Sequence, residues 1–394
     1  ALGQHEADGV VQRIPGYEQE VEPIIRDQLV NDSWPRFLHP FPLSEKYFLT
    51  ACQLNSGSPW GVYLVDVFDN LLPICVEPGV AMLEPVPLRK TMRPKVIPDK
   101  VDTARQDAVV YMNDVYKGGG LHGVPRGSVK RLRLFAFDYG YQRLANHTYI
   151  GIEGPWDVHR IVGTVKVESD GSAAFRVPAN TPLAVQPLDE EGKALQLMRS
   201  WLVAMPGESL SCVGCHERTI DAPPTHQTIA TKQQPQDITP WFGPARGFSF
   251  DREVQPVLDE YCVGCHSDKP YQGKKLVDLR QDNVQTFSRA YKELQRHVRR
   301  PGPESDYHMF PAAEYHADTS PLIQMLQKGH HGVQLDREAY ERLVTWIDLN
   351  GPYYGTWGEF RAIPDGQRER RAELRRLHAG IDEDYEDIPE LSTG

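Results

Sequence analysis

Several signatures are missing from this sequence of 394 residues. No apolar run approaches the roughly 18 residues that a membrane-spanning helix needs, so we expect no transmembrane segment. Positive charge is not in excess, because 43 Lys and Arg residues stand against 54 Asp and Glu residues and the net charge is −11. A dedicated nucleic-acid-binding protein normally carries a basic domain, so this balance argues against a nucleic-acid partner. The composition, with 40% apolar residues, also excludes a collagen and a disordered chain.

The first residues, Ala1–Gln4, contain neither the charged nor the apolar segment of an export signal, and we expect any such signal to have been removed. Proline, in contrast, is plentiful. The 32 proline residues exceed the usual share of about 5%, which indicates much loop and irregular structure.

Cysteine is scarce, but four of the six cysteines fall in two copies of one pentapeptide, Cys-Val-Gly-Cys-His. This is C-x-x-C-H, the attachment motif of c-type haem. Its two thiols bind the vinyl groups of one porphyrin, and the adjacent histidine ligates the iron. The sequence therefore predicts two covalently attached haem c groups. Their cofactor-binding residues would be Cys212, Cys215 and His216 for the first, and Cys262, Cys265 and His266 for the second.

Two alternatives to haem attachment fit these cysteines less well. A Cys₄ zinc site is disfavoured because the gap between Cys215 and Cys262 is far longer than the roughly 15–20 residues of that pattern. A thioredoxin-like redox pair needs a βαβ context, which neither copy shows.

Residues 1–98 are predicted to form an N-terminal extension and a small β unit. Residues 1–44 show no clear period. Three short apolar runs separated by turn residues predict strands over 47–52, 61–67 and 71–76, and a Pro-rich connector ends the region. This meander resembles one blade of a β-propeller, which cannot bury its own faces and must pack on something else.

Cys52 and Cys75 lie on the first and third of these strands. The middle strand would keep them roughly 10 Å apart, whereas a disulfide needs Cα atoms within about 7 Å. Two buried thiols are therefore favoured, although an oxidising compartment would permit the bond and both alternatives stay open.

Residues 99–220 predict a β-sandwich-like domain that ends in the first haem motif. Gly-rich and Asp-Gly turns separate its strands. The first haem would then lie at the edge of a β domain. The expected strands are 107–115, 129–137, 161–168, 173–178 and 181–188.

Residues 221–248 are predicted to be an irregular linker, and residues 249–360 a helical cytochrome c-like domain with the second haem. Val254, Val257, Leu258 and Tyr261 have helical spacing and lead straight into the second motif. Because of Pro256, this helix either starts near Gln255 or bends.

Two further helices are expected over 319–328 and 336–350, and residues 361–394 form a charged tail with a helix candidate over 368–378. The tail is either a solvated or docking segment or a basic patch for an electron-transfer partner. The fold class is therefore α+β and multidomain, with a β-rich N-terminal part followed by an α-helical part.

The group opposite each motif histidine decides between an electron carrier and an enzyme, because an open iron position binds substrate. For the second haem, His330 is favoured over His331, with Met309 and His308 behind them.

For the first haem, the leading candidates are His147 and His159, with His226 as a third. Each of these histidines could instead be a structural or surface residue.

Longer stretches resemble the family of the hydrazine synthase alpha subunit and its relatives. They are Gly163–Ser172, Val177–Pro182, Leu197–Trp201, Cys212–Glu217 and Trp346–Gly355. The resemblance covers roughly residues 45–390. It implies an exported, periplasmic or extracellular protein with two haems, one in a β domain and one in a cytochrome c domain, after a propeller.

In that family the catalytic haem is ligated by a tyrosine four residues after the motif histidine, and that histidine turns to zinc. The matching position here is Ile220, so the resemblance implies that this ligand set is missing. Ordinary ligation by His216 is then favoured. With only about one blade, the chain would be a shortened relative or a processed fragment.

The primary hypothesis is an exported dihaem cytochrome that passes electrons between its haems and a partner, either a redox protein or other cytochrome subunits. A second is a haem enzyme acting on small nitrogen compounds at an open first haem. A third is an assembly module that joins an oligomer or a larger complex.

Overall fold

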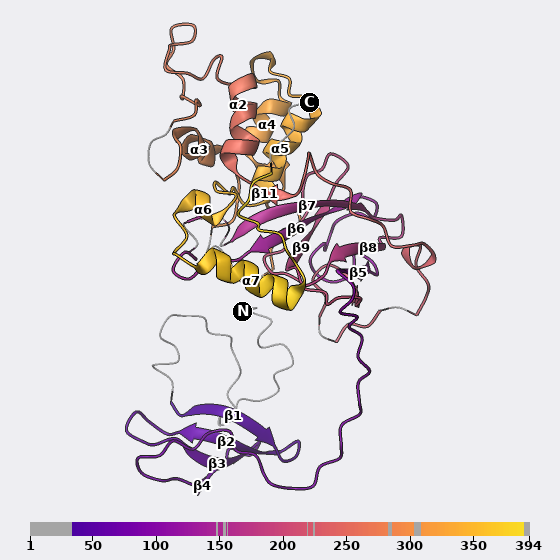
Figure 1. Cartoon of the computed structure of the whole chain (residues 1–394), viewed down its shortest axis with the longest axis vertical. Coiled ribbons are helices and arrows are strands. Elements are labelled where there is room, and N and C mark those ends of the chain that lie inside the picture. The colour runs from indigo at the N-terminus through magenta and orange to yellow at the C-terminus, as the bar shows by residue number, and fades with distance from the viewer. Residues whose placement is uncertain are drawn as a thin grey trace. The chain divides into compact units, whose positions relative to one another are not determined.

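The structure is a computed structural model that describes residues 34–146, 149–152, 155, 157–218, 220–223, 225–282, 286–302 and 309–389 (Figure 1). The chain divides into two compact units, Ala1–Pro98 and Asp99–Gly394. Three β-sheets come first and a helical C-terminal part follows, so the predicted α+β class is confirmed at this level. No helix of the described residues is long and apolar enough to cross a membrane.

The described part of the first unit is an antiparallel four-stranded meander. Its strands are β1 (Arg36–Pro42), β2 (Tyr47–Gln53), β3 (Gly61–Asp66) and β4 (Leu71–Cys75). The three predicted strands are present, whereas β1 lies in the segment that showed no period. Its register shifts between Leu38 and Phe41, and its sequence contains two prolines. The alternation of apolar and polar residues that indicates a strand is therefore absent.

Cys52 and Cys75 lie on β2 and β4, on either side of β3. Both are free thiols, Cys52 buried and Cys75 exposed. The predicted separation by a middle strand is confirmed, and the two thiols are unpaired. The predicted burial is wrong for Cys75, because it ends the edge strand β4, which is mostly exposed.

Two sheets of the second unit share one core. The three-stranded sheet has the order β10–β5–β8, and the four-stranded sheet the order β11–β7–β6–β9. Val110 and Phe175 on the first sheet pack with Leu132, Leu134 and Val165 on the second. The strands are β5 (Asp107–Met112), β6 (Arg131–Asp138), β7 (Val158–Lys166), β8 (Ala173–Pro178), β9 (Leu183–Leu188), β10 (Ser209–Cys212) and β11 (Arg246–Gly247).

The helices cover the other face of the four-stranded sheet (Figure 1). Along β6, Leu132 and Leu134 face the three-stranded sheet, whereas Phe135 and Phe137 pack with the helical core that contains Trp346. Strand β6 is therefore buried on both faces, which explains its nearly continuous apolar sequence.

The helical part contains both predicted later helices. α2 begins at Gln255 with Pro256 in its first turn, as one of the two alternatives had it, after a π-type turn over Phe250–Val254. The helices are α2 (Gln255–Tyr261), α3 (Arg289–Leu294), α4 (Pro321–Gln327), α5 (Arg337–Asp348), α6 (Trp357–Phe360) and α7 (Gln367–Ala379). The 3₁₀ turns are η2 (Ala230–Lys232), η4 (Gln295–His297), η5 (Ala317–Thr319) and η6 (His330–Gly332).

The described residues of the segment 221–248 include η2 and β11 but are otherwise irregular, and they are bound along both sheets. Thr239 and Thr164 exchange backbone hydrogen bonds of 2.9 Å, and Gln236 exchanges two of 2.8 Å with Ala174 and Arg176 on β8. Gly163 makes this approach possible, because a Cβ at its φ of 147° would collide with the Thr239 carbonyl. The segment therefore adds its own hydrogen bonds to both sheets.

Candidate haem-attachment sites

The first motif continues an edge strand. Cys212 ends β10, which pairs in parallel with β5 at the edge of the three-stranded sheet. Beyond the strand, the Asn113 N–H donates to the Cys212 carbonyl at 2.9 Å, and the Asp114 N–H donates to that of Val213 at 3.2 Å. The sheet thus fixes where the motif leaves the β core.

A run of three glycines holds the motif from one side. The Gly120 N–H donates to the Cys215 carbonyl at 3.1 Å, and a Cβ on Gly120 would lie only 2.5 Å from the Cys215 sulfur. A Cβ on Gly118 would come equally close to the Cys215 carbonyl oxygen. Glycine is therefore required for this close approach.

Glu217 closes the motif loop. Its carboxylate accepts hydrogen bonds from the N–H of Val213 and, at 3.2 Å, from that of Gly214. His216 adopts a left-handed backbone with a φ of 58°. The loop conformation is thus set by backbone contacts, and both thiols of the motif are free.

The second motif extends α2 by one turn. The Cys262 N–H donates to the Leu258 carbonyl at 2.8 Å, and the His266 N–H donates to the Cys262 carbonyl at 2.9 Å. The His266 Nδ1 lies 3.3 Å from the Val277 carbonyl. A histidine that binds a metal through one ring nitrogen is commonly oriented by such a bond at the other.

The structure brings His330 opposite His266. Their ring centroids are 6.0 Å apart and the ring planes are inclined by 26°. Two imidazoles that ligate one metal ion from opposite sides lie at about this separation, because each metal–nitrogen bond is about 2 Å. His331 contacts His330 edge-on at 4.8 Å, whereas the ring contact with His266 is made by His330.

His330 follows α4 in the turn η6, and the surface around it is hollowed. Burial, His331 and His266 all lower the pKa of His330, which favours the neutral imidazole that ligates metals. The hollow has a volume of about 410 Å³ and is lined by Pro321, Gln324, Met325, Lys328, Gly329, His330 and His331.

The thiols suit covalent attachment better than a shared zinc ion. Burial raises the pKa of Cys212, Cys215 and Cys262 to about 11, with Glu217 adding to the effect at Cys212. No group of three or more metal-ligating side chains occurs among the described residues. The donor sets fit two haem c groups, each with two free thiols followed by a histidine.

The other predicted ligands lie elsewhere. Met309, a minor candidate for the second haem, instead packs its thioether on Gly119, next to the first motif, and this alternative is wrong. His147 and His308 lie outside the described residues. His226 is exposed, and Ile220 is 77% exposed.

His159 is a core residue. Its ring lies 4.9 Å from the rings of both Phe135 and Phe137, in the core shared with the helices. Cys212 and Cys215, in contrast, pack on the core between the two sheets. The structure therefore does not bring His159 to the first motif.

Sequence reasoning missed the role of Gly118–Gly120 and of Glu217 around the first motif. The glycine run is visible in the sequence, but its contact with Cys215 depends on the pairing of β10 with β5. Strand β10 has only four residues, too few for a periodic signal.

Three comparisons with known proteins agree. Residues 127–217 match the family model of the hydrazine synthase alpha subunit middle domain. A similar curated protein is the hydrazine synthase subunit alpha of Kuenenia stuttgartiensis, 24% identical over 190 residues. That match covers 34% of this chain and 23% of the relative.

The solved structure of Kuenenia stuttgartiensis hydrazine synthase resembles this fold, with a TM-score of 0.63 and 16% sequence identity. The likeness covers 82% of this chain and 56% of the solved chain, so the chain corresponds to only part of its relatives. Residues 127–217 therefore resemble the middle domain of the hydrazine synthase alpha subunit, and the fold of the chain is similar to that of hydrazine synthase.

Proposed function

We propose that this chain is an exported dihaem c-type cytochrome that passes single electrons between its haems and a partner. The observation that carries the proposal is the pair of facing imidazoles, His266 and His330, beside the thiols of Cys262 and Cys265. An iron ion ligated on both sides has no open position for substrate, which suits electron transfer.

Each motif has a defined role. Cys212 and Cys215 would anchor the first haem, and Cys262 and Cys265 the second. When bound, each haem supplies an iron centre that accepts and releases one electron. The protein holds His266 in position through Val277 and shapes the first motif through Glu217 and the glycine run.

The finer architecture belongs to the same proposal. The first meander would be a propeller-blade-like unit, the paired sheets a β-sandwich-like haem domain, and residues 249–360 a cytochrome c-like domain. The relative is named as a subunit of a synthase, which supports a partner in a larger complex. We place the protein in the periplasm or outside the cell, where c-type haem is attached.

Double substitution of Cys262 and Cys265 by Ala tests the assignment. We expect a pyridine haemochrome assay to find two haems in the wild type and one in the variant, because the remaining motif still attaches its porphyrin. Double substitution of Cys52 and Cys75 is the matched control and should leave two. An unchanged haem count in the first variant would refute the second site.

A second candidate function is a haem enzyme for small nitrogen compounds. The position of His159 in the core favours it, because this leading candidate does not lie at the first motif. Cyanide or nitric oxide should then change the visible and EPR spectra of one high-spin haem. Two low-spin haems that do not respond would favour the electron carrier.

A further inference from the structure

A buried ion pair joins the β part of the second unit to α5. The side chains of Arg133 on β6 and Asp348 at the end of α5 are both fully buried, and Nη1 lies 3.1 Å from Oδ2. Arg133 also donates to Gln186 Oε1 at 2.7 Å, Thr345 Oγ1 at 2.9 Å and the Gly192 carbonyl at 3.1 Å. The cation is therefore firmly held by fixed acceptors.

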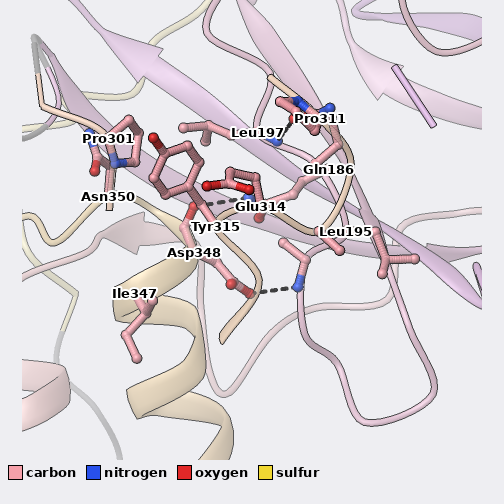
Figure 2. A pocket seen from close by; sticks show the side chains of 13 residues that line it. Gln186, Leu195, Leu197, Pro301, Pro311, Glu314, Tyr315, Ile347, Asp348 and Asn350 are labelled. Carbon is pink, nitrogen blue, oxygen red and sulfur yellow. Dashed lines mark hydrogen bonds between the residues drawn. The ribbon is translucent and has the colours of Figure 1, made fainter. Parts of the chain in front are cut away.

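Only one of the two carboxylate oxygens of Asp348 accepts hydrogen bonds from the described residues. Its Oδ2 accepts from Arg133 and, at 3.0 Å, from the Ala194 N–H, whereas its buried Oδ1 has no partner among the described residues. Asp348 lines a small cavity, and so does Asn350, whose Oδ1 is equally buried and without a described partner (Figure 2).

The size of this cavity matches one water molecule. Its volume is about 20 Å³, and a cavity needs at least roughly 10–15 Å³ to hold a water. Buried polar groups without a partner are costly, so an ordered water that donates to Asp348 Oδ1 would remove this defect.

Burial is the main reason why the pKa of Asp348 is raised, to about 6, while Arg133 lowers it. Other charged and titratable groups surround the network. Lys193 is bound by Asp318 at 2.9 Å, and His316 by Asp189 at 3.0 Å. The charged and titratable groups that act on Asp348 or line its cavity are Arg133, His316, Glu314 and Tyr315.

The cavity is linked to the first haem motif by two hydrogen bonds. Gln196 lines it and donates from Nε2 to the Gly120 carbonyl at 2.7 Å. The Gly120 N–H in turn donates to the Cys215 carbonyl. Glu314, on the cavity wall, has a side chain that is 38% exposed and paired with Arg299, so this wall of the cavity reaches the surface.

We propose that Asp348 and this cavity form a proton-binding site, in which an ordered water donates to Asp348 Oδ1 and Asp348 takes up one proton when the first haem gains one electron. The inference rests on the proposed electron-transfer function, which supplies the electron from a one-electron donor. The proton comes from solvent and returns to it on oxidation. No covalent bond other than O–H forms or breaks.

The sign of the coupling follows from charge. An added electron makes the surroundings of Asp348 more negative, which strengthens proton binding at the carboxylate. By reciprocity, a bound proton makes reduction easier. The midpoint potential of the first haem should therefore be flat below about pH 6, fall as the pH rises above it, and become flat again once both redox states are deprotonated.

The test uses the full chain with both haems and follows the potential of each haem from pH 5 to pH 9. We expect a pH-dependent potential for the first haem in the wild type and in the control Asp382→Asn, which changes an exposed carboxylate, and a flat profile in Asp348→Asn. A flat wild-type profile, or an unchanged slope in Asp348→Asn, would overturn the inference.

Infrared spectroscopy gives an independent readout that needs no redox step. A carboxylic acid band that is sensitive to deuterium should titrate near pH 6 in the oxidised wild type and be missing in Asp348→Asn. If that band never forms, the proton site is wrong even where the variant fails to fold. Haems that cannot be reduced reversibly would instead refute the proposed function.

Discussion

At the scale of single residues, His159 shows how a core can hold an ionisable group neutral. The imidazole is enclosed by Phe135 and Phe137, and its Nδ1 has no partner among the described residues. Burial lowers the pKa of His159 to about 3. The unfolded chain therefore binds a proton at this residue between about pH 6.5 and pH 3, where the folded protein does not.

This difference predicts an acid-labile fold. Acidification through the unfolded pKa favours the unfolded state, so His159 should cost about 2 kcal/mol of stability at pH 5 relative to pH 7. In His159→Phe that part of the pH dependence should vanish. Denaturant unfolding followed by circular dichroism at both pH values measures it.

The matched control is His226→Phe, which changes an exposed histidine. It should keep the wild-type loss of stability at pH 5. Equal pH dependence of His159→Phe and the wild type would show that burial does not hold His159 neutral.

At the scale of elements, the long periodic segments could be predicted and the short ones could not. Strand β8 (Ala173–Pro178) has the predicted bounds, and α5 departs from its predicted range only at the ends. Strands β10 and β11 and helices α3 and α6 have between two and six residues. Their pairing and packing partners, rather than a local pattern, decide their conformation.

The candidate sites divide in the same way. The attachment residues follow from local spacing alone, because the C-x-x-C-H motif is contiguous. The contact between His330 and His266, in contrast, depends on the path of the chain between α4 and α5, which brings η6 opposite His266. Met309 shows the limit of such reasoning, since nearness in sequence to the second haem domain placed it at the wrong motif.

The cap of α5 supports a prediction at this scale. Asp336 accepts from the Ala339 N–H at 2.7 Å and from the Tyr261 hydroxyl at 3.1 Å, so it joins α5 to the end of α2. Asp336→Ala should lower the free energy of unfolding by about 1–2 kcal/mol. Asp336→Asn keeps a good N-cap and should lose much less.

Denaturant midpoints of the two variants provide the measurement, and the haem count provides the control. Both variants should still carry two haems, because neither touches a motif cysteine. If Asp336→Ala unfolds at the wild-type midpoint, the cap contributes nothing to the helix.

At the scale of the whole molecule, the sheets and the helices of the second unit are packed together through the four-stranded sheet. The four-stranded sheet packs on the three-stranded sheet with one face and on the helical core with the other. Arg133 and Asp348 cross from the sheet to α5, and the segment 221–248 is hydrogen-bonded to both sheets. Sequence composition cannot show such packing, because a Pro-rich segment resembles a linker whether or not it is bound to the neighbouring sheets.

This arrangement predicts where a protease will cut. The connector before Asp99 contains exposed basic residues, among them Arg89 and Lys95, and its Leu88 and Met92 are almost fully exposed. Residues 221–248, although irregular, are held by backbone pairing at Thr239 and Arg246. Brief trypsin treatment should therefore cleave the connector first.

The product should be a C-terminal fragment that retains both haems and unfolds in one transition, because one continuous core has to open as a whole. Haem-stained gels and mass spectrometry of the fragment, followed by calorimetry, would measure this. If trypsin instead separated the two motifs by early cleavage within 221–248, the β part and the helical part would be independent domains. Coupling between the first motif and Asp348 through a shared core would then lose its structural basis, since that core is what holds Gln196, Gly120 and α5 in contact.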